Sequence, residues 1–155
     1  TQIYKLMLNE FENKWLLKLK DKADNNKYSV LELVTIASIV EKEAKLKEEK
    51  PIIAGIIFNR LEKNMKLQID ATVQYVLPQR KERLLYSDLK IESKYNTYLH
   101  QGLPPGPISN PGAASINAVL NPEKTEYLFY FARKDGSHVF SKTYQEHLEK
   151  QNELN

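Results

Sequence analysis

The stretch that decides the fold is "SVLELVTIASIVEKEA", residues 29–44, in which a long apolar run ends in two glutamates. Ser29 is followed three residues later by Glu32, a pairing that forms a capping box at the start of a helix. A helix is therefore predicted to begin near Val30. Its apolar spacing carries it to about Leu46.

The two glutamates of this stretch cannot act as a facing carboxylate pair. Successive helical residues advance by about 100°, so residues two apart diverge by about 160°. Counted from Leu33, Glu43 falls between Ile36 and Ile39, while Glu41 falls on the other side. If the Glu43 face is buried or lines a cleft, desolvation raises the pKa of this carboxyl. A raised pKa is what a general acid needs near neutral pH.

A purely structural reading of the same glutamates is also open. Acids at the edge of an amphipathic helix are commonly solvated or paired with lysine, and Lys42, Lys45 and Lys47 are close in the sequence. The helical angles alone favour Glu43 over Glu41 as a chemical group only slightly.

The rest of the chain predicts a helix-dominated α+β domain with a small late sheet. "LQIDATVQYVL" is ambiguous, because Asp70 could cap a short helix over 71–76 while its β-branched residues also suit a strand. Residues 102–112 hold four of the seven prolines and three of the five glycines, which predicts a rigid irregular loop. The other predicted elements are helices over 3–20, 51–64 and 113–120, a hairpin over 126–141 and a last helix after Thr143.

Composition bounds the class of protein. With 155 residues, 41% apolar and 28% charged, the chain suits one soluble domain. The net charge is only +3 and the lysines are scattered, which argues against a nucleic-acid partner. No cysteine or HExxH pattern is present, so no metal site is predicted.

No apolar run reaches 18 residues, and the start reads as the middle of a helix. We therefore expect a fragment of a longer protein whose anchor or targeting signal is not included.

Several segments taken together resemble one known family. "ASIVEKE", "IFNRL", "LQIDATVQY", "YNTY" and "GLPPGPISNPG" occur in this order between about Leu31 and His147. They resemble the catalytic domain of the YceG-like family, which are endolytic murein transglycosylases. The resemblance implies one lysozyme-like α+β catalytic domain over 1–155, with 1–28 as a lead-in helix and linker and 29–155 as the core.

The resemblance also implies the chemistry. Members cleave the β-1,4 bond between N-acetylmuramic acid and N-acetylglucosamine within glycan strands. Their catalytic glutamate lies in the "EKE" segment, and its second acid corresponds to Glu43. One acid works alone, and the C6 hydroxyl of the substrate attacks C1 to leave a 1,6-anhydro end. No cofactor or metal is implied.

Four further residues are predicted to bind the glycan. Asp70 is the candidate second carboxylate that ordinary glycosidases require, but the resemblance argues against a nucleophile and makes Asp70 a binding residue together with Gln68. Asn96 and Tyr98 of "YNTY" offer an amide and a ring, which suit sugar hydroxyls and pyranose faces. Arg60 is interpreted as half of a structural salt bridge, with a substrate carboxylate as the alternative partner.

The expected partner is peptidoglycan, with the cell-wall synthesis machinery as a further expected partner. The resemblance places the protein on the extracytoplasmic face of the bacterial membrane, held there by an anchor outside this fragment. Two other functions stay open on the sequence. One is a glycan-binding module without turnover, and the other is a lysozyme-type hydrolase that uses Asp70 as its second carboxylate.

Overall fold

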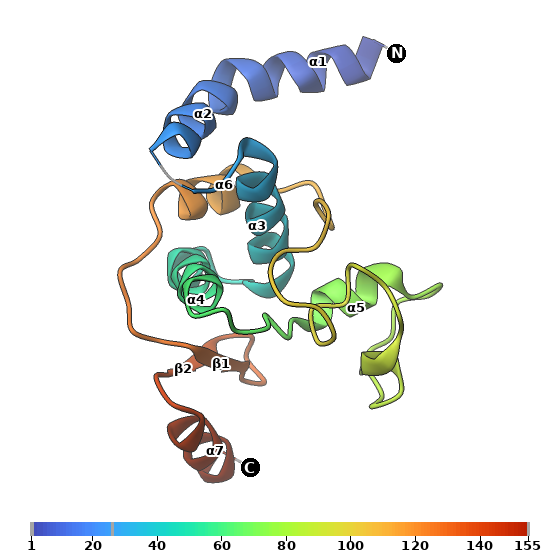
Figure 1. Ribbon diagram of the computed structural model, residues 1–155, viewed down its shortest axis with the longest axis vertical. Helices are drawn as coiled ribbons and strands as arrows, with labels where there is room; N and C mark the ends of the chain where they lie inside the picture. The colour runs from blue at the N-terminus through green and yellow to red at the C-terminus, as the bar shows by residue number, and fades with distance from the viewer. Residues whose placement is uncertain (1, 26, 155) are drawn as a thin grey trace.

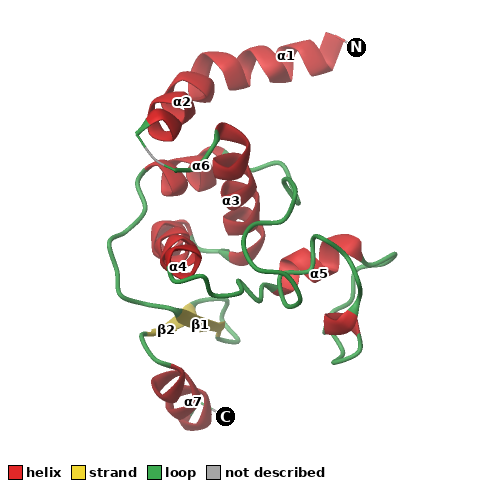
Figure 2. Ribbon diagram, viewed as in Figure 1, coloured by secondary structure: helices red, strands yellow, loops and turns green. Residues whose placement is uncertain are grey.

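The computed structural model describes residues 2–25 and 27–154, so Thr1, Asn26 and Asn155 of the predicted 1–155 domain lie outside the described residues. The fold is the predicted helix-dominated α+β arrangement (Figures 1 and 2). Its elements are α1 (Gln2–Phe11), the π-helical turn η1 (Glu12–Leu16), α2 (Leu17–Asp24), α3 (Val30–Glu43), η2 (Lys47–Glu49), α4 (Lys50–Glu62), α5 (Asp70–Val76), η3 (Asp88–Lys90), α6 (Ala113–Leu120), β1 (Phe129–Ala132), β2 (His138–Ser141) and α7 (Tyr144–Glu153).

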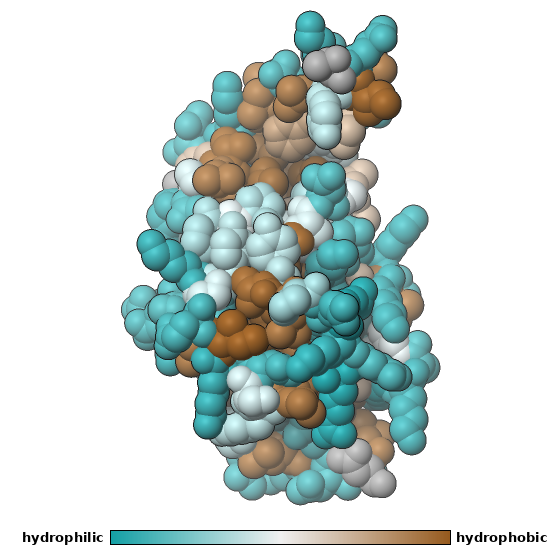
Figure 3. Space-filling model, turned by 90° about the vertical axis from the view of Figure 1, so that its right-hand side faces the viewer, coloured by the Kyte–Doolittle hydropathy of each residue, from teal (hydrophilic) through white to brown (hydrophobic). Residues whose placement is uncertain are grey.

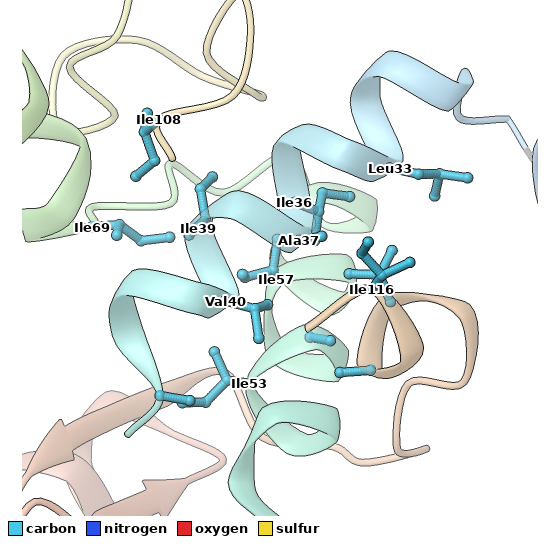
Figure 4. Packing of buried hydrophobic residues seen from close by; sticks show 14 of the residues in the cluster. Leu33, Ile36, Ala37, Ile39, Val40, Ile53, Ile57, Ile69, Ile108 and Ile116 are labelled. Carbon is cyan, nitrogen blue, oxygen red and sulfur yellow. The ribbon is translucent and has the colours of Figure 1, made fainter. Parts of the chain in front are cut away.

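The core lies where α3, α4 and α6 pack on one another. Figure 4 shows side chains from all three helices meeting there, joined by Ile69 and Ile108 from the flanking loops. Ile36, Ile39 and Ile53 have no exposed surface. Burying such a side chain contributes about 1.5–3 kcal/mol, so this cluster is the rigid body against which the other segments are placed.

Helix α3 begins as predicted and ends earlier than predicted. The Ser29 hydroxyl accepts from the Glu32 N–H at 3.3 Å, and the Glu32 carboxylate accepts from the Ser29 N–H at 2.8 Å. The predicted end near Leu46 is wrong, because Ala44 adopts an extended backbone (φ −91°, ψ 117°). Its side chain is 4% exposed within the core, so packing overrides the helical pattern and leaves Glu43 as the last helical residue.

The N-terminal helices are only partly covered. Leu19 of α2 is fully buried and reaches the core, as do Phe11 and Trp15 in part. Ile3 is 72% exposed and Leu6 is 64% exposed. Figure 3 shows hydrophobic side chains on the surface at this upper end of the molecule. Within the described residues, no helix combines the length and apolarity needed to cross a bilayer.

Helix α4 holds the segment that leads into the sheet. The Glu123 N–H donates to the Pro51 carbonyl at 3.0 Å, and the Asn59 amide donates to the carbonyls of Thr125 and Tyr127 at 2.7 and 3.1 Å. Gly55 allows this close approach, because a Cβ on Gly55 would lie 2.3 Å from the Glu123 carbonyl oxygen. The position of β1 is thus set along the face of α4.

The late sheet is the predicted hairpin. Strands β1 and β2 pair antiparallel, with Tyr130 opposite Phe140. Gly136, at φ 87°, supplies the left-handed conformation of the turn. Helix α7 packs on both strands. This helix begins after Thr143 as predicted, and the Thr143 hydroxyl accepts from the Glu146 N–H. The Glu146 carboxylate accepts from the Lys142 N–H.

The ambiguous segment before residue 77 is helical, not a strand. Helix α5 begins at Asp70, and its N-cap is Ile69 with no side-chain cap bond, so the predicted capping role of Asp70 is wrong. The irregular loop 102–112 is confirmed and is tied to α3. The Ile108 N–H donates to the Ser38 hydroxyl at 3.0 Å, and the Ser109 hydroxyl donates to the Ser38 carbonyl at 3.0 Å.

Candidate active site

A cavity of about 440 Å³ lies where the end of α3 faces α5, the hairpin and α7. Its lining residues come from α3, α4, α5, both strands, α7 and the loops before α5 and at Tyr98: Lys42, Glu43, Arg60, Leu67, Gln68, Asp70, Tyr98, Tyr130, Phe131, Ala132, His138, His147 and Gln151.

The cavity is one member of a row of hollows. It shares Lys42 with a hollow of about 230 Å³ beside α5. It shares Phe131, Ala132 and Gln151 with a hollow of about 630 Å³ beside the hairpin and α7. Glu43 therefore lines the cavity that shares lining residues with both of these hollows.

Glu43 is half-buried at the last position of α3, and among the described residues its carboxylate has one side-chain partner. The Tyr130 hydroxyl donates to Glu43 Oε2 at 2.8 Å. Burial raises the pKa of Glu43 above its ordinary value, the negative charge of Asp70 raises it further, and the bond from Tyr130 offsets part of this rise. Burial also raises the pKa of Tyr130, so this hydroxyl stays a neutral donor.

Glu41, two residues earlier, has the opposite environment. Its Oε2 accepts from Lys50 Nζ at 2.8 Å, from the Ser115 hydroxyl, and from the Gly112 N–H at 3.3 Å. Partial burial alone would raise the pKa of Glu41, but these bonds outweigh it and the pKa is lowered. Glu41 is therefore an ionised structural group, held by a lysine farther along the chain than the three considered from the sequence.

Asp70 and Tyr98 meet at the rim of the cavity. The Tyr98 hydroxyl donates to Asp70 Oδ1 at 2.5 Å. Burial and this bond raise the pKa of Tyr98, so it remains a donor. Asp70 itself is exposed. The two carboxyls in the cavity thus differ, because Glu43 is desolvated while Asp70 is solvated and hydrogen-bonded.

Arg60 borders the cavity with most of its donors occupied. Its Nε donates to the Leu128 carbonyl at 2.6 Å, and one terminal nitrogen donates to the carbonyls of Lys66 and Leu67 at 3.1 and 2.7 Å. The guanidinium carbon lies 5.1 Å from the centre of the Phe129 ring. The interpretation of Arg60 as half of a salt bridge is wrong, because its partners are backbone carbonyls. Its role is to join α4, the segment before α5 and the hairpin.

A buried acid–imidazole pair ties the hairpin to the helical core. The Glu49 carboxylate accepts from the His138 N–H at 2.9 Å and contacts His138 Nδ1 at 2.6 Å. Both residues are 8% exposed. The His138 ring meets the Tyr130 ring edge-on, with centroids 5.6 Å apart. This pair therefore holds β2, the strand that pairs with the Tyr130-bearing strand β1.

The same arrangement of segments recurs in known proteins. The sequence model of the YceG-like family matches residues 1–153. The chain is 46% identical over 145 residues to an endolytic murein transglycosylase of Bacillus subtilis (strain 168), covering 94% of this chain.

The chain belongs to the YceG-like family.

Two further relatives agree with this membership. An endolytic murein transglycosylase of Streptococcus pneumoniae serotype 2 (strain D39) is 34% identical over 76% of this chain. The crystal structure of a YceG-like protein of Listeria monocytogenes superposes with a TM-score of 0.88, at 43% identity over 96% of this chain. The chain spans 40% of the Bacillus protein, 22% of the Streptococcus protein and 48% of the Listeria chain.

In this YceG-like domain the structure brings together four of the five predicted site residues. Glu43, Gln68, Asp70 and Tyr98 all line the cavity. Gln68 is exposed there at φ 52°, a left-handed conformation uncommon for a residue other than glycine. Such backbone positions cluster at functional sites.

Asn96 is the predicted site residue that the structure places elsewhere. It is fully buried, and its amide donates to the carbonyls of Leu89 and Ile91 at 3.0 and 2.9 Å. Its side-chain oxygen accepts from the Tyr98 N–H at 3.0 Å. With all these groups satisfied, Asn96 shapes the loop that presents Tyr98 instead of lining the cavity.

Three residues of the cavity were not singled out for it by the sequence. Tyr130 lies within the predicted hairpin. The signal that the sequence offered is that the hydroxyl of a tyrosine packed in a fold usually finds a hydrogen-bond partner. His138 lies on the predicted hairpin and His147 on the predicted last helix, and neither carried a site prediction. Burial and the charge of Arg60 lower the pKa of His147, which keeps it neutral at pH 7. No cluster of acids and histidines suited to a metal occurs in residues 2–25 and 27–154.

Another hollow, of about 710 Å³, lies between α4 and residues 122–127. Its acids Glu62, Glu123 and Glu126 are all exposed, and the ion pair with Lys142 lowers the pKa of Glu126. The acids of this hollow are thus open to solvent, whereas Glu43 is half-buried in its cavity.

Proposed function

We propose that this domain is the catalytic part of an endolytic peptidoglycan lytic transglycosylase, with Glu43 as its acid and then its base. One observation carries the proposal: among the described residues, Glu43 is the carboxyl whose pKa burial raises, and it lines a cavity that shares lining residues with two further hollows. The Bacillus and Streptococcus relatives bear the name endolytic murein transglycosylase, which supports peptidoglycan as the substrate.

In the proposed reaction Glu43 acts twice, first as a proton donor and then as a proton acceptor. Protonated Glu43 donates to the glycosidic oxygen, and the bond from C1 of N-acetylmuramic acid to that oxygen breaks. The C6 hydroxyl of the same sugar forms a new bond to C1 and gives its proton to the Glu43 carboxylate. The acid is thereby restored, and no water is consumed. The hydroxyl of Tyr130 stabilises the carboxylate between the two steps, since it donates to Oε2 at 2.8 Å.

The row of hollows supports cleavage within strands. Hollows that share lining residues with the cavity offer room for sugars beyond the one at Glu43, whereas a closed pocket would accept only a chain end. A glycan-binding module without turnover would make no use of a desolvated acid at this position. That function is therefore the weaker alternative.

The lysozyme-type hydrolase is the second candidate, because Asp70 lines the same cavity. In that reaction a second carboxylate would act as nucleophile or activate water. Asp70 is instead exposed and accepts the Tyr98 hydroxyl at 2.5 Å. An internal hydroxyl beside C1 also has a higher effective concentration than a competing water molecule. We therefore favour the lyase.

Product analysis tests the proposal. Purified peptidoglycan strands would be digested with this chain in its full-length protein, and the products measured by mass spectrometry. We expect 1,6-anhydro-muramoyl ends, lighter by one water than hydrolysis products, and no new reducing ends at muramic acid. Hydrated, reducing ends in the majority would establish the hydrolase instead.

This proposal includes a location and partners. Because peptidoglycan lies outside the cytoplasmic membrane, we place the full-length protein on the extracytoplasmic face, beside the machinery of cell-wall synthesis. Protease added to spheroplasts should degrade this domain. Protection of the domain until the cells are lysed would contradict the location.

A further inference from the structure

The hollow beside α5 adjoins the cavity, with which it shares Lys42. It holds about 230 Å³ and is lined by Lys42, Ala71, Gln74, Tyr75, Arg80 and Ile108. Lys42 precedes Glu43 in α3, and Ala71 follows Asp70 in α5, so two lining residues are chain neighbours of the acids in the cavity. A group bound in this hollow would belong to the sugar next to the bond that Glu43 cleaves.

Two cations face this hollow without acidic partners. Lys42 and Arg80 are both exposed, and neither forms an ion pair with any acid of the described residues. Arg60, by contrast, is engaged by the carbonyls of Lys66, Leu67 and Leu128. An anion entering the site would therefore meet Lys42 and Arg80 as the available cations on this side.

The remaining lining residues give the hollow a defined shape. Tyr75 is 50% exposed, and its ring is supported by Tyr95, with centroids 4.9 Å apart. The Gln74 amide donates to the Lys81 carbonyl at 2.8 Å and accepts from the Lys81 N–H at 3.0 Å. This clamp holds the backbone next to Arg80 against α5. The hollow thus combines a supported aromatic face with two cations, which suits an anion carried on an apolar arm.

We propose that this hollow binds the arm on C3 of N-acetylmuramic acid, which is the lactyl group with or without its stem peptide. Lys42 and Arg80 would bind the carboxylates of this arm, and Tyr75 would pack against its apolar part. The inference rests on the proposed function and names the part of the substrate that the site selects. The carboxylate has two sources, the stem peptide in intact strands and the lactyl group itself in strands stripped of peptide. The arm distinguishes peptidoglycan from a glycan made of N-acetylglucosamine alone.

Binding to the Glu43→Gln variant of the full-length protein tests the inference without cleavage. The probes are soluble glycan oligomers in three forms: peptide-bearing, stripped of peptide, and stripped with the lactyl carboxylate converted to a methylamide. We expect the methylamide form to bind about tenfold more weakly than the better of the two anionic forms, the scale of one charge-assisted hydrogen bond. Which anionic form binds better identifies the source.

Arg80→Gln, added to Glu43→Gln, should abolish this difference, and Arg83→Gln is the matched control. Arg83 is an exposed cation in the same loop but does not line the hollow, so its loss should leave the tenfold difference in place. Equal binding of all three probes, or a difference that persists in Arg80→Gln, would overturn the inference. The product spectra of the unmutated protein test the proposed function separately, so the two failures are distinguishable.

Discussion

Glu41 and Glu43 lie two residues apart on one helix, yet their surroundings give them opposite chemistry. Glu41 faces Lys50, Ser115 and the Gly112 N–H at the start of α6, and these groups hold it as an anion. Glu43 faces the cavity, where burial favours its protonated form. The difference shows that the partners supplied by the rest of the fold, and not the residue type, decide which acid can donate a proton.

Helix ends add to this contrast. Gly112 is the N-cap of α6, so Glu41 lies at the positive end of a helix dipole. Glu43 is the last residue of α3, at the negative end of its own helix. The first arrangement stabilises a carboxylate and the second disfavours it.

The largest effect is expected from Glu43→Gln. This variant keeps the size of the side chain and its bond to Tyr130 while removing the transferable proton. Turnover of glycan strands should fall at least about a hundredfold, with an unchanged circular dichroism spectrum. If Glu41→Gln were inactive while Glu43→Gln kept its activity, the two roles would be reversed.

Glu41→Gln should instead act on stability. Lys50 is 6% exposed and would lose its ionic partner. Removing one member of a buried pair costs about 3–5 kcal/mol, and the 33% exposure of the Glu41 side chain reduces our expectation to about 1–3 kcal/mol. Urea unfolding measures this loss. Glu10→Gln, which breaks the exposed pair with Lys14, is the control and should change stability by less than about 0.5 kcal/mol. Equal stability of the Glu41 variant and the parent would contradict the pairing.

Tyr130→Phe should change how the activity that depends on Glu43 varies with pH. The Tyr130 hydroxyl lowers the pKa of Glu43, so its removal raises that pKa. A general acid loses activity as pH rises through its pKa, so the alkaline limb of the rate profile should move to higher pH. The rate below that limb should fall about tenfold at most, the scale of one lost hydrogen bond to a charged group. A limb that moves to lower pH would show that Tyr130 does not act on Glu43.

The smallest effect is expected from Asp70→Asn. Its negative charge raises the pKa of Glu43, so the variant should move the same limb to lower pH, opposite to Tyr130→Phe. Activity should fall only a few-fold, because the amide keeps the shape and can still accept from Tyr98. Loss as severe as that of Glu43→Gln, in a protein that still folds, would place Asp70 in the chemistry as a hydrolase requires.

Local signals made much of the fold predictable. The capping box at Ser29, the helix predicted over 51–64 and the hairpin predicted over 126–141 each depend on residues close in the sequence, and each occurs near the place that the sequence indicates. The end of α3 was not predictable, because it depends on the burial of Ala44 within the core.

The site was less predictable, since its contacts join distant parts of the chain. Tyr130 reaches Glu43 across 87 residues, and Glu49 reaches His138 across 89. The angular argument and the family motif both indicated Glu43, but neither could name its partner. Asn96 suited a sugar by residue type, whereas in the fold its amide satisfies backbone carbonyls of its own loop. Sequence alone cannot distinguish these two uses of an amide.

Gly55 has a consequence for how this domain can vary. A Cβ at position 55 would lie 2.3 Å from the Glu123 carbonyl oxygen. Any other amino acid would therefore displace the segment around Glu123 from α4. That segment leads directly to the strand that carries Tyr130. Natural selection on catalysis should therefore act on Gly55 as strongly as on many residues of the cavity, although Gly55 has no side chain and takes no part in the reaction.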